Sequence, residues 1–303
     1  MYHYEIRAKQ FVATAMDLTF NEFQLATDKL HSEIRKDFEN NLITLHTLNR
    51  RYGDYRKIIL NSELSIEKKS YIDGMLKMSE EETKLRFESN QRALAEKKSN
   101  AVIFNGDKDE YIQLAESLLT HKNMMNRVVA FCVLTGRRES EIGLTANFEK
   151  IDDFHVMFSG QLKTPDNNKK YPIPLLTTSN VIIEALAEFR ASKDYSRGFN
   201  PYSIEATRKF NSSYSNDIKT SHIRFFTSYY QSDKPKVHDL RMIYANLTYL
   251  DFNNSPVLID SMKEEMKITN PIKAMDRELY IKRVLGHVSF QATMSYTNLE
   301  ITP

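Results

Sequence analysis

The stretch "YIQLAESLLTHKNMMNRVVAFCVLTG", residues 111–136, constrains the fold more than any other part of this chain. Its second half carries apolar residues on all sides, which is typical of a helix enclosed in a protein core. Gly136 ends the run, and glycine is the usual residue that stops a helix in a left-handed conformation. We therefore expect one or two core helices here, with the other elements packed around them.

The overall composition is that of a soluble, mostly helical protein. The chain has 303 residues, 41% hydrophobic and 27% charged, with only 8 glycines and 8 prolines. No apolar run reaches the roughly 18 to 20 residues that cross a bilayer. The first residues, "MYHYEIRAKQ", lack the apolar segment of a secretion signal. Cys132 is the single cysteine and is expected to be a small buried hydrophobe. We expect a cytoplasmic protein with no membrane partner.

The length suggests two domains, and the pattern changes near residue 104. Residues 1–104 are predicted to be a helical N-terminal region, in which "NEFQLATDKLHSEIRKDF" has apolar residues at helical spacing. Residues 65–100 form one long charged helix or two. The turn signal "NGDKD" near residues 100–111 predicts a linker. Residues 105–303 then form the second domain.

The second domain is predicted to be mainly α with one small β-hairpin. "FHVMFSGQLK" and "KYPIPL" alternate apolar residues at period two, and "PDNNKK" between them favours a turn. Helices are expected again at 179–192, with Ser179 as N-cap, at 233–250, at 276–287 and at 289–298. Gly286 ends the third of these helices, and Ser289 caps the last one.

Two arginines follow the core helix in "TGRRESEIG". Arg137 or Arg138 would emerge there, and a planar guanidinium can bind two phosphate oxygens at once. Glu141 lies three residues after Arg138 on the same helix face and can orient it. The plainer interpretation is a solvated arginine pair with an ion partner.

Three further groups of residues can serve the same chemistry. His238 and Arg241 in "HDLR" share a helix face and can both donate to one anion, although a helix-start histidine beside a surface arginine is equally simple. A hairpin lysine, Lys163, Lys169 or Lys170, can deliver a proton to a leaving group, although hairpin tips are often lysine-rich anyway.

The last group is "LGHVSFQATMSYTN". His287 follows Gly286, where a histidine is often only a helix cap. Tyr296 stands nine residues later, and Tyr280 is a competing tyrosine. In chain order the groups are TGxR, a hairpin lysine, HxxR, GH and a tyrosine. The first four supply cations and donors for a pentacoordinate phosphorane, and the tyrosine supplies a nucleophile.

This order resembles the catalytic domain of the tyrosine recombinases, whose fold is shared with type IB topoisomerases. The resemblance runs from about residue 107 onwards, and "TGRRESEI", "FHVMFSGQLKT" and "HDLRMIYANL" are most similar to telomere resolvases, or protelomerases. An insertion at 251–276 agrees better with resolvases than with simple integrases. The resemblance implies two phosphate-clamping arginines, a general acid, two histidines and a nucleophile, which are Arg138 and Arg241, Lys163, His238 and His287, and Tyr296.

The resemblance also implies a function. Such an enzyme cleaves a palindromic double-stranded DNA site through a 3′-phosphotyrosyl bond and closes the ends into hairpin telomeres. It acts as a homodimer on an inverted repeat, without metal, ATP or another cofactor, in the cytoplasm on phage or plasmid DNA. The N-terminal region would clamp the duplex. The residues of this region that are expected to contact DNA phosphates are Arg50, Arg51, Arg56 and Lys57. Arg137 of the second domain is expected to contact DNA as well. Stacking by Tyr52 or Tyr55 is a further expectation.

Three other functions remain open from the sequence. A conventional recombinase or integrase would use the same residues to exchange strands between two duplexes. A DNA-binding protein with a decayed site is less consistent with the complete set of six residues. A relaxing topoisomerase is disfavoured by the "TGRR" and "FSGQ" segments.

Overall fold

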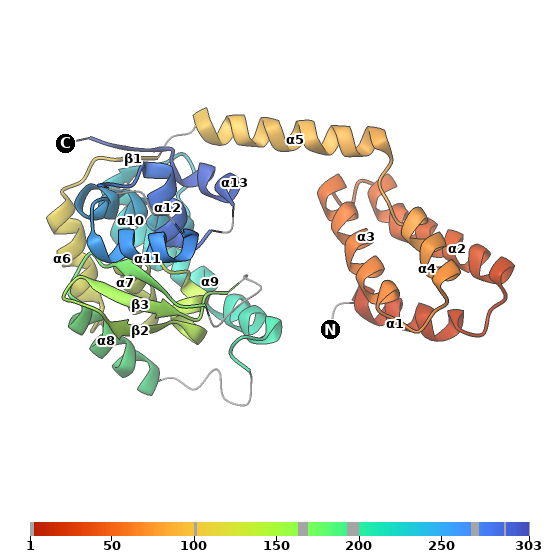
Figure 1. Ribbon diagram of the computed structural model, residues 1–303, viewed down its shortest axis with the longest axis horizontal. Helices are drawn as coiled ribbons and strands as arrows, with labels where there is room; N and C mark the ends of the chain where they lie inside the picture. The colour runs from red at the N-terminus through yellow and green to blue at the C-terminus, as the bar shows by residue number, and fades with distance from the viewer. Residues whose placement is uncertain are drawn as a thin grey trace. The chain divides into compact units, whose positions relative to one another are not determined.

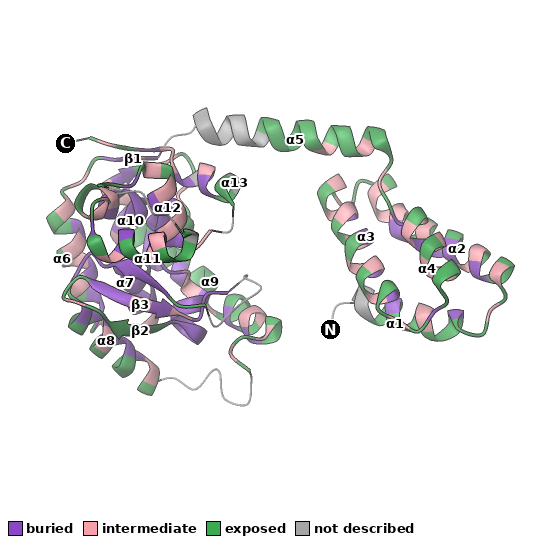
Figure 2. Cartoon of the chain, viewed as in Figure 1, coloured by how far each residue is buried: buried purple, intermediate pink, exposed green. Residues whose placement is uncertain are grey.

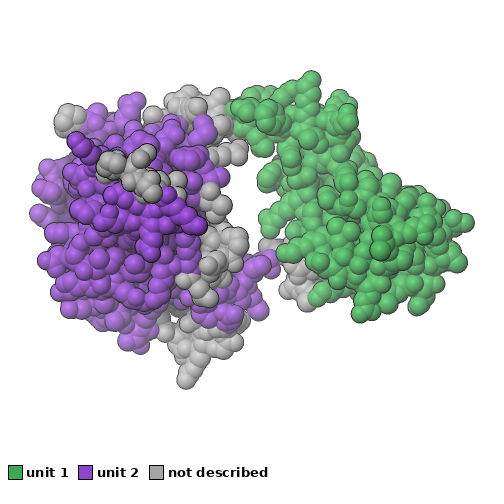
Figure 3. Space-filling model, in the orientation of Figure 1, with its two compact units in different colours: residues 1–95 green, residues 96–303 purple. Residues whose placement is uncertain are grey.

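The computed structural model describes residues 3–99, 102–162, 169–192, 200–267, 273–287 and 289–302. The chain divides into two compact units, residues 1–95 and residues 96–303, which are coloured separately in Figure 3. The domain boundary that the sequence suggests, after residue 104, stays a prediction. Among the described residues, no helix is both long and apolar enough to span a bilayer.

The N-terminal unit is built from helices (Figure 1). They are α1 (His3–Ala15), α2 (Phe20–Glu39), α3 (Leu45–Leu60), α4 (Ile66–Met75) and the first part of α5 (Glu80–Ser99). The side chains of Thr19, Thr44 and Ser65 begin α2, α3 and α4 by accepting hydrogen bonds from free backbone N–H groups. The charged stretch 65–100 is therefore two helices, which was one of the two predicted arrangements.

Aromatic residues fill the core of this unit. Phe23 is fully buried, and Tyr52 and Tyr55 are only 1% and 2% exposed. The Tyr52 hydroxyl lies 3.0 Å from Nε2 of His31. The expectation that Tyr52 or Tyr55 stacks on DNA is therefore wrong, because both rings are part of the packing between helices.

The second unit is organised around α7 (Met124–Thr135), in which every residue after the first is buried. Helix α7 packs against α6 (Lys108–Leu118), α8 (Ser179–Ala191), α9 (Ile204–Phe226) and α10 (Val237–Phe252). Buried residues gather in the interior of this unit (Figure 2). Gly136 ends α7 with φ of 63°. The predicted core helix, its glycine stop and the buried Cys132 are thus confirmed.

The predicted hairpin is confirmed and belongs to a three-stranded antiparallel sheet. Its strands are β2 (Asn147–Lys150), β3 (His155–Ser159) and β4 (Tyr171–Pro174), in the order β2-β3-β4. Val156 pairs with Ile173 and Phe158 with Tyr171. Strand β2 was not predicted. The turn residues 163–168 lie outside the described part of the chain.

A second small sheet was not predicted at all. Strand β1 (Val102–Phe104) pairs antiparallel with β5 (Tyr230–Gln231) and parallel with β6 (Leu299–Ile301). Residues 102–104, which the sequence suggested to be part of a linker, are therefore a central strand. Strand β6 follows Tyr296 almost directly, so the segment after this tyrosine is held in a sheet.

The remaining elements lead to the site. They are the π-type turn η1 (Glu141–Thr145), the 3₁₀ turn η2 (Thr227–Tyr229), α11 (Pro256–Met266), α12 (Arg277–Leu285), α13 (Phe290–Thr293) and the 3₁₀ turn η3 (Met294–Tyr296). Gly286 ends α12 with φ of 63°, and Ser289 caps α13, both as predicted. The N-cap of α8 is Thr178, one residue before the predicted Ser179, which is instead the first helical residue.

Candidate active site

Five of the six predicted catalytic residues meet at one place in the second unit. Arg138 follows α7, His238 and Arg241 lie in the first turns of α10, His287 follows α12, and Tyr296 ends η3. Three regions far apart in the sequence, at 138, 238–241 and 287–296, therefore converge. The sixth residue, the predicted general acid at position 163, lies outside the described residues.

The Tyr296 ring lies between two imidazoles. Its centroid is 4.9 Å from that of His238 and 4.7 Å from that of His287. The tyrosine is only 4% exposed, whereas His238 is exposed. Tyr280, the competing tyrosine, is fully buried and packs against Tyr249 instead. The position between two histidines distinguishes Tyr296 from the other tyrosine.

Arg241 joins the ends of two helices. Its Nη1 donates to the carbonyl of Gly136 at 2.5 Å, and its Nη2 donates to the carbonyl of Leu285 at 2.6 Å. The side chain is 2% exposed. Burial, with further repulsion from Arg137 and Arg138, lowers the pKa of Arg241 to about 10. The group still carries its charge at neutral pH, and its two carbonyl partners do not neutralise it.

Glu141 is the carboxylate of the cluster and confirms the predicted orientation of Arg138. Its Oε1 accepts from Nη1 of Arg138 at 2.6 Å and from the N–H of Leu162 at 3.1 Å. Glu141 is fully buried. Burial opposes its ionisation, but the surrounding guanidinium groups, Arg138 foremost, hold the pKa of Glu141 below its usual value. One carboxylate thus fixes both Arg138 and the start of the loop after β3.

Arg137 lies elsewhere than expected. It is 1% exposed, with Nη1 donating to the Tyr171 hydroxyl at 2.8 Å and Nη2 donating to the carbonyl of Val284 at 2.5 Å. Its guanidinium carbon is 4.7 Å from the centroid of the Phe158 ring. A side chain enclosed in this way has no surface to offer to DNA, so the structure corrects the prediction of a direct contact.

The network from Arg137 continues to the turn that carries His287. Tyr171 donates to Oε1 of Gln161 at 2.8 Å, and Nε2 of Gln161 donates to the carbonyl of Gly286 at 2.9 Å. A Cβ at Gly286 would lie 2.3 Å from both Oε1 of Gln161 and the Tyr171 hydroxyl. Gln161 and Tyr171 were not recognised from the sequence, because their role depends on how α12 packs against the hairpin.

His287 is neutral in this environment. Burial, followed by the repulsion of Arg241, Arg138 and Arg137, lowers the pKa of His287 to about 3. Its Nδ1 lies 3.2 Å from Oγ1 of Thr293, whose hydroxyl donates to the carbonyl of Ser289. With the hydroxyl proton on the Ser289 carbonyl, Nδ1 of the histidine is the donor and Nε2 of the neutral ring is the acceptor; the tautomer is an assignment from this hydrogen-bond pattern.

The electrostatic balance of the cluster favours an anion. Arg137, Arg138 and Arg241 bring three positive charges, and Glu141 brings one negative charge, in a largely buried region. Charges in such a region are screened less than charges in water. A phosphate group matches the remaining positive charge and the donor geometry of guanidinium groups. No group of three potential metal ligands of the His, Cys, Asp or Glu type occurs among the described residues.

The other predicted DNA contacts lie on α3 of the N-terminal unit. Each arginine there pairs with an aspartate: Arg51 with Asp37 at 2.5 Å, Arg56 with Asp73 at 2.7 Å, and Arg50 with Asp54 at 3.8 Å. Lys57 is exposed. Their contact with DNA stays a prediction.

The curated relatives of this chain are protelomerases of phages. The chain is 23% identical over 298 residues to the protelomerase of Klebsiella oxytoca phage phiKO2, which covers 93% of this chain and 43% of the relative. It is 24% identical over 223 residues to that of Escherichia phage N15, which covers 69% of this chain and 33% of the relative. The chain thus spans less than half the length of either relative.

The fold has a counterpart among solved structures. A structure described as protelomerase TelA covalently complexed with substrate DNA superposes with a TM-score of 0.74 at 18% identity, covering 99% of this chain and 89% of that chain. A family model described as the telomere resolvase ResT/TelK catalytic domain matches residues 100–298. Since that match covers well over half of the chain and includes all six predicted catalytic positions, the chain belongs to the telomere resolvase ResT/TelK catalytic domain family.

Proposed function

We propose that this chain is a DNA-cleaving and rejoining enzyme that converts a palindromic duplex site into two hairpin telomeres. The observation that carries the proposal is the position of Tyr296 between His238 and His287, beside the cluster of Arg138 and Arg241. A structural neighbour, described as a mutant protelomerase TelA complexed with DNA hairpin product, supports the same reaction (TM-score 0.73).

The first step is a transesterification. The Tyr296 oxygen attacks the phosphorus, the bond to the 5′-oxygen breaks, and the 3′-phosphate becomes linked to the tyrosine. We assign Nε2 of His287 as the acceptor of the phenolic proton, because the negative charge of a bound phosphate offsets the repulsion from Arg138 and Arg241 that keeps the ring neutral in the free protein. The imidazolium so formed joins Arg138 and Arg241 in stabilising the phosphorane. The energy of the phosphodiester is retained in the phosphotyrosyl bond, so the reaction needs no ATP.

The leaving 5′-oxygen needs a proton, which we assign to Lys163 on the basis of the sequence resemblance. In the second step the 5′-hydroxyl of the complementary strand attacks the phosphotyrosyl bond and releases Tyr296. Because a palindromic site presents one equivalent phosphate on each strand, the enzyme acts as a homodimer on an inverted repeat. In this proposal the arginines and Lys57 of α3 bind DNA phosphates, and the enzyme works wherever its DNA lies, in the cytoplasm.

The test is direct. The protein is incubated with a duplex that carries its inverted repeat, in buffer with a chelator and without ATP, and the products are separated on a denaturing gel. Snap-back strands of doubled length are the expected products. Strands exchanged between two duplexes would favour a conventional recombinase, and relaxation alone would favour a topoisomerase. Either result would refute hairpin formation.

The role of Lys163 has its own test. Lys163→Ala should slow cleavage of an ordinary phosphate strongly, because the 5′-oxygen then leaves without a proton. A substrate with a 5′-bridging sulfur has a leaving group that needs no proton, so the same variant should cleave it at close to the wild-type rate. Equal slowing on both substrates contradicts the general-acid assignment.

A further inference from the structure

Helix α10 carries more than the two predicted catalytic residues. Beyond His238 and Arg241 it presents Asn246, which is 1% exposed. Nδ2 of Asn246 donates to the carbonyl of Tyr296 at 2.9 Å and to the carbonyl of Met242, one helical turn earlier, at 2.8 Å. The buried side-chain amide of Asn246 therefore binds the backbone of Tyr296, the residue assigned as nucleophile.

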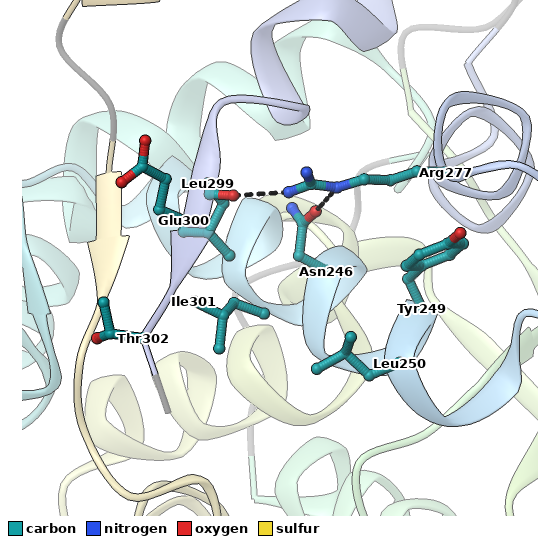
Figure 4. A pocket seen from close by; sticks show the side chains of 8 residues that line it. All are labelled: Asn246, Tyr249, Leu250, Arg277, Leu299, Glu300, Ile301 and Thr302. Atoms are coloured by element: carbon teal, nitrogen blue, oxygen red, sulfur yellow. Dashed lines mark hydrogen bonds between the residues drawn. The ribbon is translucent and has the colours of Figure 1, made fainter.

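Arg277, the first residue of α12, completes the contact. Its Nε donates to Oδ1 of Asn246 at 2.7 Å, and its Nη2 donates to the carbonyl of Leu299 at 2.7 Å (Figure 4). Figure 4 shows both bonds at the edge of a pocket lined by α10, Arg277 and residues of β6. The two side chains thus hold the segment 296–299 at its first and last carbonyl groups.

These contacts occur where the backbone passes from the 3₁₀ turn into β6. Tyr296 is the last residue of η3, and the carbonyl groups at a helix end have no partner within the helix. Residues 297 and 298 belong to neither a helix nor a strand. The Asn298 carbonyl accepts a hydrogen bond from the Val102 N–H at 3.2 Å, and the bonds from Asn246 and Arg277 hold the carbonyl groups of Tyr296 and Leu299 on either side of it.

We propose that Asn246 and Arg277 are positioning residues for the nucleophile. Asn246 ties the Tyr296 backbone to the helix that carries His238 and Arg241, and Arg277 holds Asn246 and Leu299 in place. The attacking oxygen and the groups that bind the phosphate are thereby kept in one rigid frame. This inference rests on the proposed function, because it assumes that Tyr296 attacks DNA.

The two residues do not face the phosphate, so their loss acts on geometry rather than on DNA affinity. A nucleophile displaced by about 1 Å costs on the order of a hundredfold in rate. Loss of one buried hydrogen bond that holds it corresponds to roughly tenfold or more. DNA contacts elsewhere are unaffected, so the concentration for half-saturation should stay within about twofold.

The experiment compares Asn246→Ala, Asn246→Asp and Arg277→Met with the wild type and with Thr248→Val. Thr248 is a matched control because it is fully buried on the same helix, and its described hydrogen bonds go to the α10 carbonyl groups of Tyr244 and Ala245 and to the Tyr280 side chain, not to the segment 296–299. The single-turnover rate of covalent adduct formation is measured at saturating protein, and DNA affinity is measured separately by titration.

We expect all three test variants to form adduct about tenfold more slowly or worse, with DNA affinity unchanged, and the control to behave as wild type. Asn246→Asp keeps the shape and the acceptor for Arg277 but removes the donor to Tyr296, so it separates positioning from misfolding. The double variant Asn246→Ala/Arg277→Met should lose little more than the slower single variant, because both act through one contact.

The outcomes are distinguishable. A wild-type protein that forms no adduct refutes the proposed function itself. A wild type that forms adduct while Asn246→Asp does so at the same rate refutes the positioning role. Equal losses of rate and DNA affinity, or a loss in Thr248→Val as large as that in Asn246→Ala, would also overturn it, because a general weakening of α10 then explains the data.

Discussion

The arginines of the two units are neutralised in different ways. On α3 of the N-terminal unit each of Arg50, Arg51 and Arg56 faces an aspartate of its own at or near the surface. In the second unit Arg138 binds the buried carboxylate of Glu141, whereas the described hydrogen bonds of the Arg137 and Arg241 guanidinium groups go to backbone carbonyl groups or to a tyrosine. The carbonyl groups accept hydrogen bonds without cancelling the charge, and Nε of Arg241 has no partner among the described residues.

This difference separates two kinds of phosphate binding. The buried cluster keeps an uncompensated positive charge in a poorly screened region, which suits stabilisation of one reacting phosphate. In the proposed DNA complex the α3 arginines would exchange an aspartate for a DNA phosphate, so each would contribute modestly and be sensitive to salt. We infer that the first arrangement serves catalysis and the second serves general affinity.

The strongest test of the second unit removes the nucleophile. Tyr296→Phe should abolish the covalent protein–DNA adduct on a denaturing gel, because no oxygen remains to attack, while DNA affinity stays within about twofold. Tyr280→Phe is the matched control, since Tyr280 is fully buried and nearby in sequence. Adduct formation by Tyr296→Phe, or its loss only in Tyr280→Phe, would contradict the assignment.

The next test removes a carboxylate from each unit. Glu141→Gln leaves three guanidinium groups without a counter-charge in the core, so we expect a loss of about 3–5 kcal/mol in the free energy of unfolding. Asp37→Asn removes the partner of the partly exposed Arg51 and should cost about 1 kcal/mol or less. Denaturant titrations measure both. Similar losses of unfolding free energy in the two variants would contradict the difference between the two units.

Acid should weaken the second unit in a defined range. His287 and His222 have pKa values lowered to about 3 and about 4, mainly by burial. Both are neutral in the folded state, whereas the unfolded chain binds protons below its ordinary pKa of about 6.5. Stability is therefore complete above that pH and falls as the pH is lowered towards 4.

The expected slope approaches about 1.4 kcal/mol per pH unit for each histidine. It is measured by denaturant titration at several values between pH 7 and pH 4. His222→Gln removes one of the two groups, so its stability should depend less steeply on pH than that of the wild type. An identical slope in the variant would show that His222 is not held neutral.

The smallest effects are expected on α3. Arg51→Gln and Arg56→Gln should change stability by about 1 kcal/mol at most. If these side chains meet phosphates, each variant should reduce the slope of log affinity against log salt by about 0.9. Arg7→Gln is a matched control, because Arg7 pairs with Glu33 and lies on α1. A control with the same change in slope would exclude a specific role of α3.

The sequence predicted what depends on local pattern. The core helix α7, its stop at Gly136, the hairpin of β3 and β4, and the stop at Gly286 follow from apolar spacing and glycine chemistry within a few residues. The proposed catalytic positions came from their order along the chain. The structure then brought the five described positions together, which no local pattern specifies.

The sequence missed what depends on distant partners. Helix α9 contains many serine and asparagine residues with weak helix propensity. It is held by packing on α7 and by the burial of Phe210, Ile218 and Phe226 in the core of the second unit. The strands of the β5-β1-β6 sheet have two or three residues each, too few to show a period. Arg137 and Arg138 are adjacent in the sequence, but their side chains leave the backbone in different directions. The Arg137 side chain therefore lies in the core and not in the site.

The parallel pairing of β1 with β6 imposes an order on the assembly of the protein. Val102 pairs with Leu299, so this sheet closes only when residues at opposite ends of the second unit meet. Contacts so distant in sequence form late in folding, because the intervening chain must first be ordered. On the ribosome, Tyr296 and β6 emerge after α7 and α10. A nascent chain therefore acquires its proposed nucleophile only when the helices next to the proposed phosphate-binding arginines have already been synthesised.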